Sequence, residues 1–145
     1  MSIYGIYFIY QITKGEEIML AVQLQNPNVK IETTKIHEVL LSIGIPPNLL
    51  GYGYIISAME IIALNPWCLH SITKELYVDI ALKYRVSASS VERAIRNAIS
   101  IGWLHGNIDY IYHIFKNCVN PDKGVPTNSI FLSRLFHYFN SVEFE

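Results

Sequence analysis

Hydrophobic residues recur at helical spacing along the chain from residue 33 onward. Apolar positions stand three or four residues apart in six segments, which are separated by stretches that contain Gly, Pro, Asn or Ser. The predicted helices are 34–43, 48–64, 73–85, 89–103, 107–115 and 127–139. Segment 48–64 is apolar almost all round, so it is the predicted central helix of the core. The pattern predicts an all-α, six-helix bundle, with Thr34 capping the first helix and Thr127 or Asn128 capping the last.

Residues 1–32 have a different pattern and form a predicted N-terminal extension. Segment 2–12 is rich in Ile, Tyr and Phe, segment 13–16 has the composition of a turn, and segment 18–25 is a second run with strand propensity. Two strands alone are marginal in water, so the extension is either a small hairpin or poorly ordered. A start of the natural product at Met19 is a further alternative. The predicted organisation is therefore this extension followed by one helical domain, 33–145.

The predicted helices 73–85 and 89–103 have the spacing of a helix-turn-helix. Ala81 is the small residue at which the first helix crosses the second. Val91, ten residues later, is the first inward residue of the second helix, and Ile95 continues that face. Many such motifs have Gly where this chain has Arg85, because Gly adopts a positive φ most easily. Arg85 therefore weakens the match to the general pattern.

The second of these helices separates its polar and apolar residues completely. At 100° per residue, one arc holds the polar residues Ser89, Ser90, Glu92, Arg93, Arg96, Asn97 and Ser100, and the opposite arc holds Val91, Ala94, Ile95, Ala98, Ile99 and Ile101. Arg, Asn and Glu match the donors and acceptors of base edges in the major groove. Small Ser residues let a helix N-terminus approach phosphates. The arc predicts a recognition helix over about 89–103.

The same polar arc is also what an ordinary surface helix shows. Ser89 and Glu92 have the spacing of a capping box, and Glu92 and Arg96 have the spacing of an i,i+4 ion pair. Helix-turn-helix folds also serve as protein-binding modules. DNA recognition and protein binding therefore both remain open at this point.

Composition limits the functions that are open to the chain. With 11 Lys and Arg against 12 Asp and Glu, the net charge is −1, so any contact with DNA must come from a local group of cations. No apolar run approaches the ~18 residues of a membrane span, and no secretory signal is evident, which predicts a cytoplasmic protein without membrane contact. Cys68 and Cys118 are too far apart for a CxxC motif, and neither His70 nor His113 completes a usual metal site. No motif of a cofactor site or an enzyme is present.

From about residue 35 to residue 139 the sequence resembles a known family. The matching stretches are IHEVLLSIGIPPNLLGYGYI, SITKELYVDIALKY, SASSVERAIRNAI, HGNIDYI and PTNS at 126–129. They resemble the C-terminal DNA-binding effector domain of the stage 0 sporulation protein A family, the master response regulators of endospore formation in Firmicutes. The resemblance implies a six-helix domain with a helix-turn-helix of the winged-helix-like, response-regulator effector type. It also implies binding to short promoter boxes, often in tandem, and activation or repression of transcription.

The resemblance further implies roles for individual residues. Glu92 and Arg93 match the family's base-reading pair, and Arg96 matches a residue that supports backbone or base contact. The implied candidates for phosphate contacts are Ser89, Lys83, Thr127, Asn128 and Ser129. Ser90 and Asn97 belong to the same predicted DNA-binding face but stand where the family usually has basic residues. We therefore expect weaker binding with a flatter salt dependence than in relatives.

The family's phospho-acceptor receiver has no counterpart in residues 1–32, which are too few to form it and contain no Asp. Regulation by phosphorylation is therefore not expected on this stretch. The expected partner is double-stranded promoter DNA, with a second copy paired through the last helix, RNA polymerase and a full-length regulator as further candidates. The alternative function is an interaction module that pairs with such a regulator and modulates it.

Overall fold

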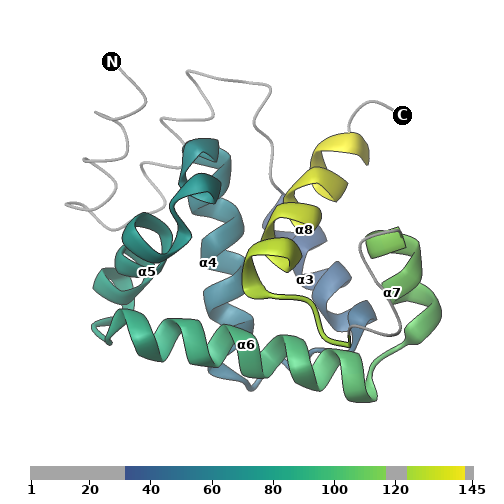
Figure 1. Cartoon of the computed structure of the whole chain (residues 1–145). Helices are drawn as coiled ribbons and strands as arrows, with labels where there is room; N and C mark the ends of the chain where they lie inside the picture. Colours follow the sequence, from purple (N-terminus) through teal and green to yellow (C-terminus); the bar gives the residue numbers. More distant parts are fainter. Residues whose placement is uncertain (1–31, 117–123, 143–145) are drawn as a thin grey trace.

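The computed structural model describes residues 32–116 and 124–142, and these ranges contain helices but no strand (Figure 1). The elements are α3 (Thr33–Ile43), α4 (Leu50–Leu64), the 3-10 helix η1 (Pro66–His70), the π-helix η2 (Ile72–Leu76), α5 (Tyr77–Tyr84), α6 (Ala88–His105), α7 (Ile108–Phe115) and α8 (Asn128–Val142). The predicted all-α fold with six α-helices is confirmed for the described ranges, where no β wing flanks the helix-turn-helix. The predicted hairpin and Cys118 lie outside them, and the division at residues 32 and 33 stays a prediction.

Two of the predicted helix starts are wrong. The residue that precedes α3 is Glu32, in an extended conformation, so Thr34 lies inside the helix, and no side chain of the described residues caps its start. The helix predicted over 73–85 begins as the π-helix η2 and becomes α-helical only at Tyr77. At the start of α8 the prediction is confirmed, because the Thr127 hydroxyl accepts a hydrogen bond from the Ile130 N–H at 3.2 Å.

Helix α4 is the centre of the core, as predicted. Twelve of its fifteen residues are buried, so nearly all of this helix lies inside the bundle. It crosses α6 at Gly51, where a Cβ would overlap the carbonyl group of Ala94 and crowd the side chain of Ala98. Glycine at this position lets the two backbones touch, and this contact holds α6 against the bundle.

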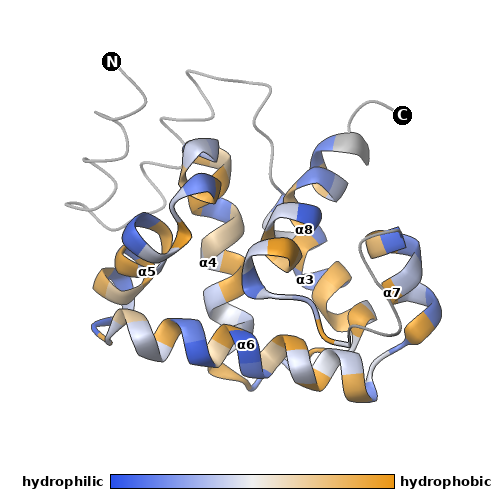
Figure 2. Ribbon diagram, viewed as in Figure 1, coloured by the Kyte–Doolittle hydropathy of each residue, from blue (hydrophilic) through white to orange (hydrophobic). Residues whose placement is uncertain are grey.

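Helix α6 runs along one edge of the molecule, and α4, α5 and α8 all pack on it (Figure 1). Hydrophilic and hydrophobic residues alternate along α6, as expected of a helix with one buried face (Figure 2). Near its C-terminal end, Trp103 lies edge-on to Phe115 of α7 and Phe131 of α8, at ring-centroid distances of 5.0 and 5.9 Å. In the described ranges, no helix combines the length and the apolar character that crossing a bilayer requires.

Candidate nucleic-acid interface

The turn between α5 and α6 has the backbone geometry that the motif requires. Arg85 adopts φ 57° and ψ 46°, the left-handed conformation that the sequence pattern assigns to this position. The N–H of Val86 donates to the carbonyl oxygen of Ala81 at 3.0 Å, which closes the end of α5 in the manner of a Schellman cap. Ala81 is buried, and Val91 and Ile95 are fully buried beneath α6. The predicted inward residues of the helix-turn-helix are confirmed.

The start of α6 is held by Ser87, which the sequence pattern does not single out. Its hydroxyl oxygen accepts from the N–H of Ser90 at 3.1 Å and lies 2.7 Å from the hydroxyl oxygen of Ser90. The capping box expected from Ser89 and Glu92 is wrong, because α6 begins at Ala88 and Ser89 already lies within its first turn. The signal that points to Ser87 is its position directly before the amphipathic run. Ser89 remains exposed at the helix start.

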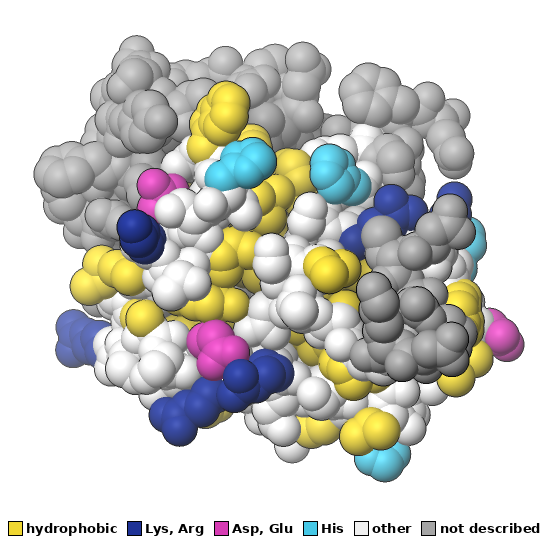
Figure 3. All heavy atoms as spheres, in the orientation of Figure 1, with side chains coloured by type: hydrophobic (Ala, Val, Ile, Leu, Met, Phe, Trp, Pro, Cys, Tyr) yellow, Lys and Arg dark blue, Asp and Glu magenta, His cyan; other side chains and the backbone are white. Residues whose placement is uncertain are grey.

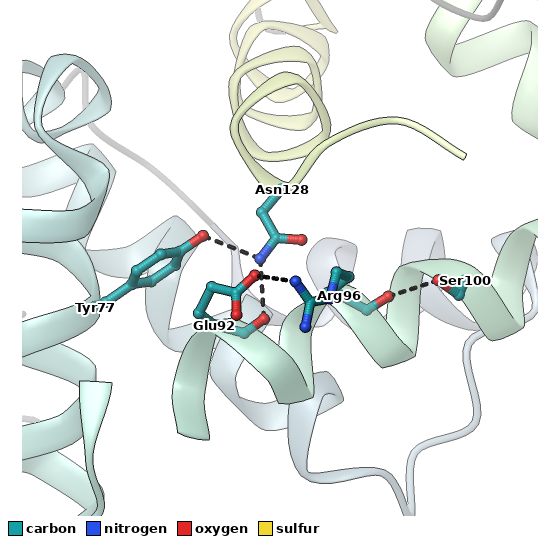
Figure 4. Close-up of polar contacts among 5 residues, drawn as sticks. All are labelled: Tyr77, Glu92, Arg96, Ser100 and Asn128. Carbon is teal, nitrogen blue, oxygen red and sulfur yellow. Dashed lines mark hydrogen bonds and ion pairs between the residues drawn. The ribbon is translucent and has the colours of Figure 1, made fainter. Parts of the chain in front are cut away.

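The outward face of α6 carries two pairs of side chains with different surroundings. Nη1 of Arg96 lies 2.9 Å from Oε1 of Glu92, which confirms the expected i,i+4 ion pair (Figure 4). The Arg96 side chain is 60% exposed, so water screens this pair and it contributes at most about 1 kcal/mol. Arg93 and Asn97 are also exposed, and neither makes a hydrogen bond or ion pair within the described ranges. These two side chains are therefore free to meet a ligand.

Asn128, predicted to contact phosphate, lies instead in a buried junction between three helices (Figure 4). Its amide nitrogen donates to the hydroxyl oxygen of Tyr77 at 3.0 Å and to the backbone carbonyl oxygen of Glu92 at 3.0 Å. Burial raises the pKa of Tyr77, so this hydroxyl stays protonated. The sequence does not connect Tyr77 with residue 128, because the two are 51 positions apart.

A groove of about 640 Å³ lies between η1, η2, the middle of α6 and the start of α8. Arg96 and Ser100 line it from α6, and Thr127 and Ser129 line it from the start of α8. Thr127 and Ser129 are both exposed. The structure therefore brings these two predicted phosphate-contact residues next to the outward face of α6.

Lys83 is turned toward α4. Its Nζ donates to the hydroxyl oxygen of Ser57 at 3.0 Å and lies 3.8 Å from a carboxylate oxygen of Glu60. The same nitrogen lies 5.3 Å from the centre of the Tyr84 ring. Burial raises the pKa of Glu60, and the charge of Lys83 opposes that rise. The structure therefore does not bring Lys83 to the outward face of α6.

Basic side chains gather in a row along α6, with an acidic side chain beside them (Figure 3). Arg93 and Arg96 are the cations of α6, and Arg85 precedes the helix on the turn.

Elsewhere, burial raises the pKa of the Cys68 thiol to about 12, so it stays protonated. Within residues 32–116 and 124–142, no group of three His, Cys, Asp or Glu residues is placed to hold a metal ion. The interface therefore offers charge and hydrogen bonds as its means of recognition.

The sequence of the chain matches a known protein family over most of its length. Residues 36–139, more than two thirds of the chain, match the family described as Sporulation initiation factor Spo0A C terminal. The match runs from the first turns of α3 into the last turns of α8 and includes the whole helix-turn-helix. This is a family of DNA-binding effector domains that act in sporulation initiation. The chain belongs to the family of Spo0A C-terminal domains.

Proposed function

We propose that the chain is a sequence-specific DNA-binding transcription regulator of the sporulation-initiation type, in which α6 enters the major groove. The observation that carries the proposal is the outward face of α6, where the exposed side chains of Arg93 and Asn97 have no hydrogen-bond or ion-pair partner among the described residues. Directly behind this face, Val91 and Ile95 are fully buried, so the helix is firmly seated and its polar side is available. A helix presented in this way has the size and the donors that the major groove accepts.

The residues of this face take different parts in the proposed complex. Arg93 donates two hydrogen bonds to a guanine, and Asn97 hydrogen-bonds an adenine. Glu92 accepts from a cytosine amino group, and Arg96 exchanges its ion pair with Glu92 for a phosphate. This exchange costs little, because an exposed ion pair is worth at most about 1 kcal/mol. In the protein without DNA, the ion pair between Glu92 and Arg96 thus holds both side chains along the helix.

Phosphates lie at two places in the proposed complex. The N-terminal turn of α6, with exposed Ser89 and partly buried Ser90, faces one strand, because a helix N-terminus favours negative charge. The groove beside α6 takes a second phosphate, with Thr127 and Ser129 at its rim and Arg96 opposite. These contacts set the position of α6 on the duplex, and the base contacts supply the specificity.

The proposal is tested by selecting duplexes from a random pool with the full chain and then measuring Kd by fluorescence anisotropy at two salt concentrations. Arg93→Ala should weaken binding to the selected duplex by about 1–3 kcal/mol, or roughly 5- to 150-fold. The matched control is Lys35→Ala, which removes the same charge from α3, a helix that packs on α4 and α7. Unchanged affinity and base preference in Arg93→Ala would rule out this mode of binding.

We also propose that the chain acts in the cytoplasm and contacts RNA polymerase. On tandem boxes, we propose that two copies pair through α8. The supporting observation is that Ser129, Ile130 and His137 are all exposed on α8. Sedimentation of the chain with duplexes that carry one or two selected boxes tests the pairing. Two copies that bind the double box without mutual stabilisation would count against it.

The alternative proposal is an interaction module for a full-length regulator. It is favoured by the net charge of −1, which leaves the whole chain without an excess of cations. A stable complex with such a regulator, together with failure to select any duplex, would favour this alternative over DNA binding.

A further inference from the structure

We infer that Asn128 is a positioning residue that sets the orientation of α6 for DNA recognition, rather than a residue that contacts DNA. The inference rests on the proposed function of α6. Asn128 is only 8% exposed and lies at the point where α5, α6 and the first turn of α8 meet. Its side-chain amide is turned into this junction (Figure 4).

Both N–H donors of the Asn128 amide group are used inside the protein. An Asn side chain has two N–H hydrogens, and here one serves the Tyr77 hydroxyl and the other the Glu92 carbonyl, each at 3.0 Å. A carbonyl in a helix accepts one bond from the residue four positions later and has a second lone pair to offer. Asn128 uses that second lone pair, so it is bonded directly to the backbone of α6. Donation from this amide to a phosphate would require at least one of these two bonds to break.

The position of this bond along α6 determines what it does. Glu92 directly precedes Arg93. The backbone of Ala94, two residues after Glu92, lies against Gly51 of α4. Residues two apart in a helix are about 200° apart around its axis, so the two backbone contacts act on nearly opposite sides. One contact alone would allow α6 to rotate about its axis, whereas the two together resist rotation. The direction in which Arg93 points is therefore tied to α4 through Gly51 and to α8 through Asn128.

Base recognition depends on that direction more than phosphate contact does. A two-pronged hydrogen bond from Arg to guanine tolerates displacements of only about 0.5 Å, whereas attraction to the phosphate chain is less directional. A small rotation of α6 should therefore lower the affinity for a selected duplex and leave the binding of random duplexes nearly unchanged. A change in a residue that contacts phosphate should lower both affinities together and reduce the salt dependence.

The test compares Asn128→Asp with Tyr77→Phe in the full chain. Asn128→Asp keeps the shape of the side chain but replaces the donor by an oxygen that faces the Glu92 carbonyl. The added negative charge lies beside the proposed phosphate groove and should weaken binding to every duplex. We therefore expect the Kd for a duplex selected by the wild-type chain to rise at least 10-fold more than the Kd for random duplexes at the same salt concentration. Tyr77→Phe keeps the bond to Glu92, so its ratio of the two Kd values should stay within 2-fold of the wild type. Equal loss on both duplexes in Asn128→Asp, or an unchanged ratio, would overturn the inference.

A second readout does not depend on DNA. NMR residual dipolar couplings of the free protein report the angle between α6 and α4, and this angle should change in Asn128→Asp but not in Tyr77→Phe. An angle unchanged in Asn128→Asp refutes the positioning role, even if the wild-type chain selects no duplex and the proposed function fails. If Asn128→Asp does not fold, NMR couplings across the hydrogen bond from Asn128 to Glu92 in the wild-type protein decide the question. Their detection supports the inference, and their absence overturns it.

Discussion

Replacing Arg85 by Gly should make the protein more stable, although it removes an exposed cation next to α6. Arg85 occupies the left-handed region, with φ 57° and ψ 46°, because the N–H of Val86 must turn back to reach the carbonyl of Ala81. The Arg85 side chain is exposed and makes no hydrogen bond or ion pair within residues 32–116 and 124–142. The substitution therefore changes the backbone energy of the turn and little else.

The magnitude follows from two opposing contributions. A residue with a Cβ gives up about 1–2 kcal/mol in the left-handed conformation, and Gly is free of this strain. Gly in turn raises the entropy of the unfolded chain, which costs roughly 0.5–1 kcal/mol. We expect Arg85→Gly to increase the free energy of unfolding by about 0.5–1 kcal/mol, and Tm by roughly 1–4 °C for a chain of this length.

Urea denaturation followed by circular dichroism measures the effect. Arg85→Ala is the matched control, because it removes the same charge and retains the strained conformation. The difference between the Gly and Ala variants isolates the backbone contribution, and Arg85→Asn should fall between them, since Asn tolerates this region better than most residues. Equal stability of the Gly and Ala variants would refute the strain argument.

Three further predictions concern packing, capping and pH. Gly51→Ala should cost more than about 3 kcal/mol or prevent folding, because the new Cβ meets the Ala94 backbone. At Gly53 a new Cβ would make only an ordinary contact with the Tyr84 hydroxyl oxygen at 3.8 Å, so Gly53→Ala should be neutral or stabilising by up to ~1 kcal/mol. Comparable unfolding midpoints of the two variants in urea would contradict this. Ser87→Ala should lower the free energy of unfolding by about 1 kcal/mol and Ser89→Ala by almost nothing, since Ser87 is the residue whose side chain caps α6. A larger loss of Tm in Ser89→Ala than in Ser87→Ala would instead support a capping box formed by Ser89 and Glu92. Burial raises the pKa of Asp79 from its usual 3.8 to about 7. The folded state therefore holds this proton more tightly than the unfolded state does, and stability should fall as pH rises from about 4 to about 7, by at most ~1.4 kcal/mol per pH unit. Asp79→Asn should flatten this slope in urea denaturation, and an unchanged slope would assign the pH dependence to other groups.

Local pattern was sufficient for the presence of the six α-helices, though not for the starts of α3 and α5, and for the two faces of α6. The apolar spacing of segment 48–64 predicts a central helix, and twelve of the fifteen residues of α4 are buried. Val91 and Ile95 were assigned to the core because a helix has a fixed angle per residue, and both are fully buried. The i,i+4 pairing of Glu92 with Arg96 follows from the same geometry. Each of these depends on residues that are close in the chain, so the sequence by itself determines them.

Tertiary structure decided the surroundings of the polar residues on other elements. Asn128 and Lys83 were both expected to reach phosphate, yet Asn128 bonds to Tyr77 and Glu92, and Lys83 bonds to Ser57 of α4. Their partners lie between 26 and 51 residues away, and no periodicity within one helix indicates which helices will meet. The apolar pattern of this sequence therefore determines its helices and the face that α6 presents. The packing of those helices determines which polar side chains remain free for DNA, because a buried polar group must find a partner wherever the fold places one.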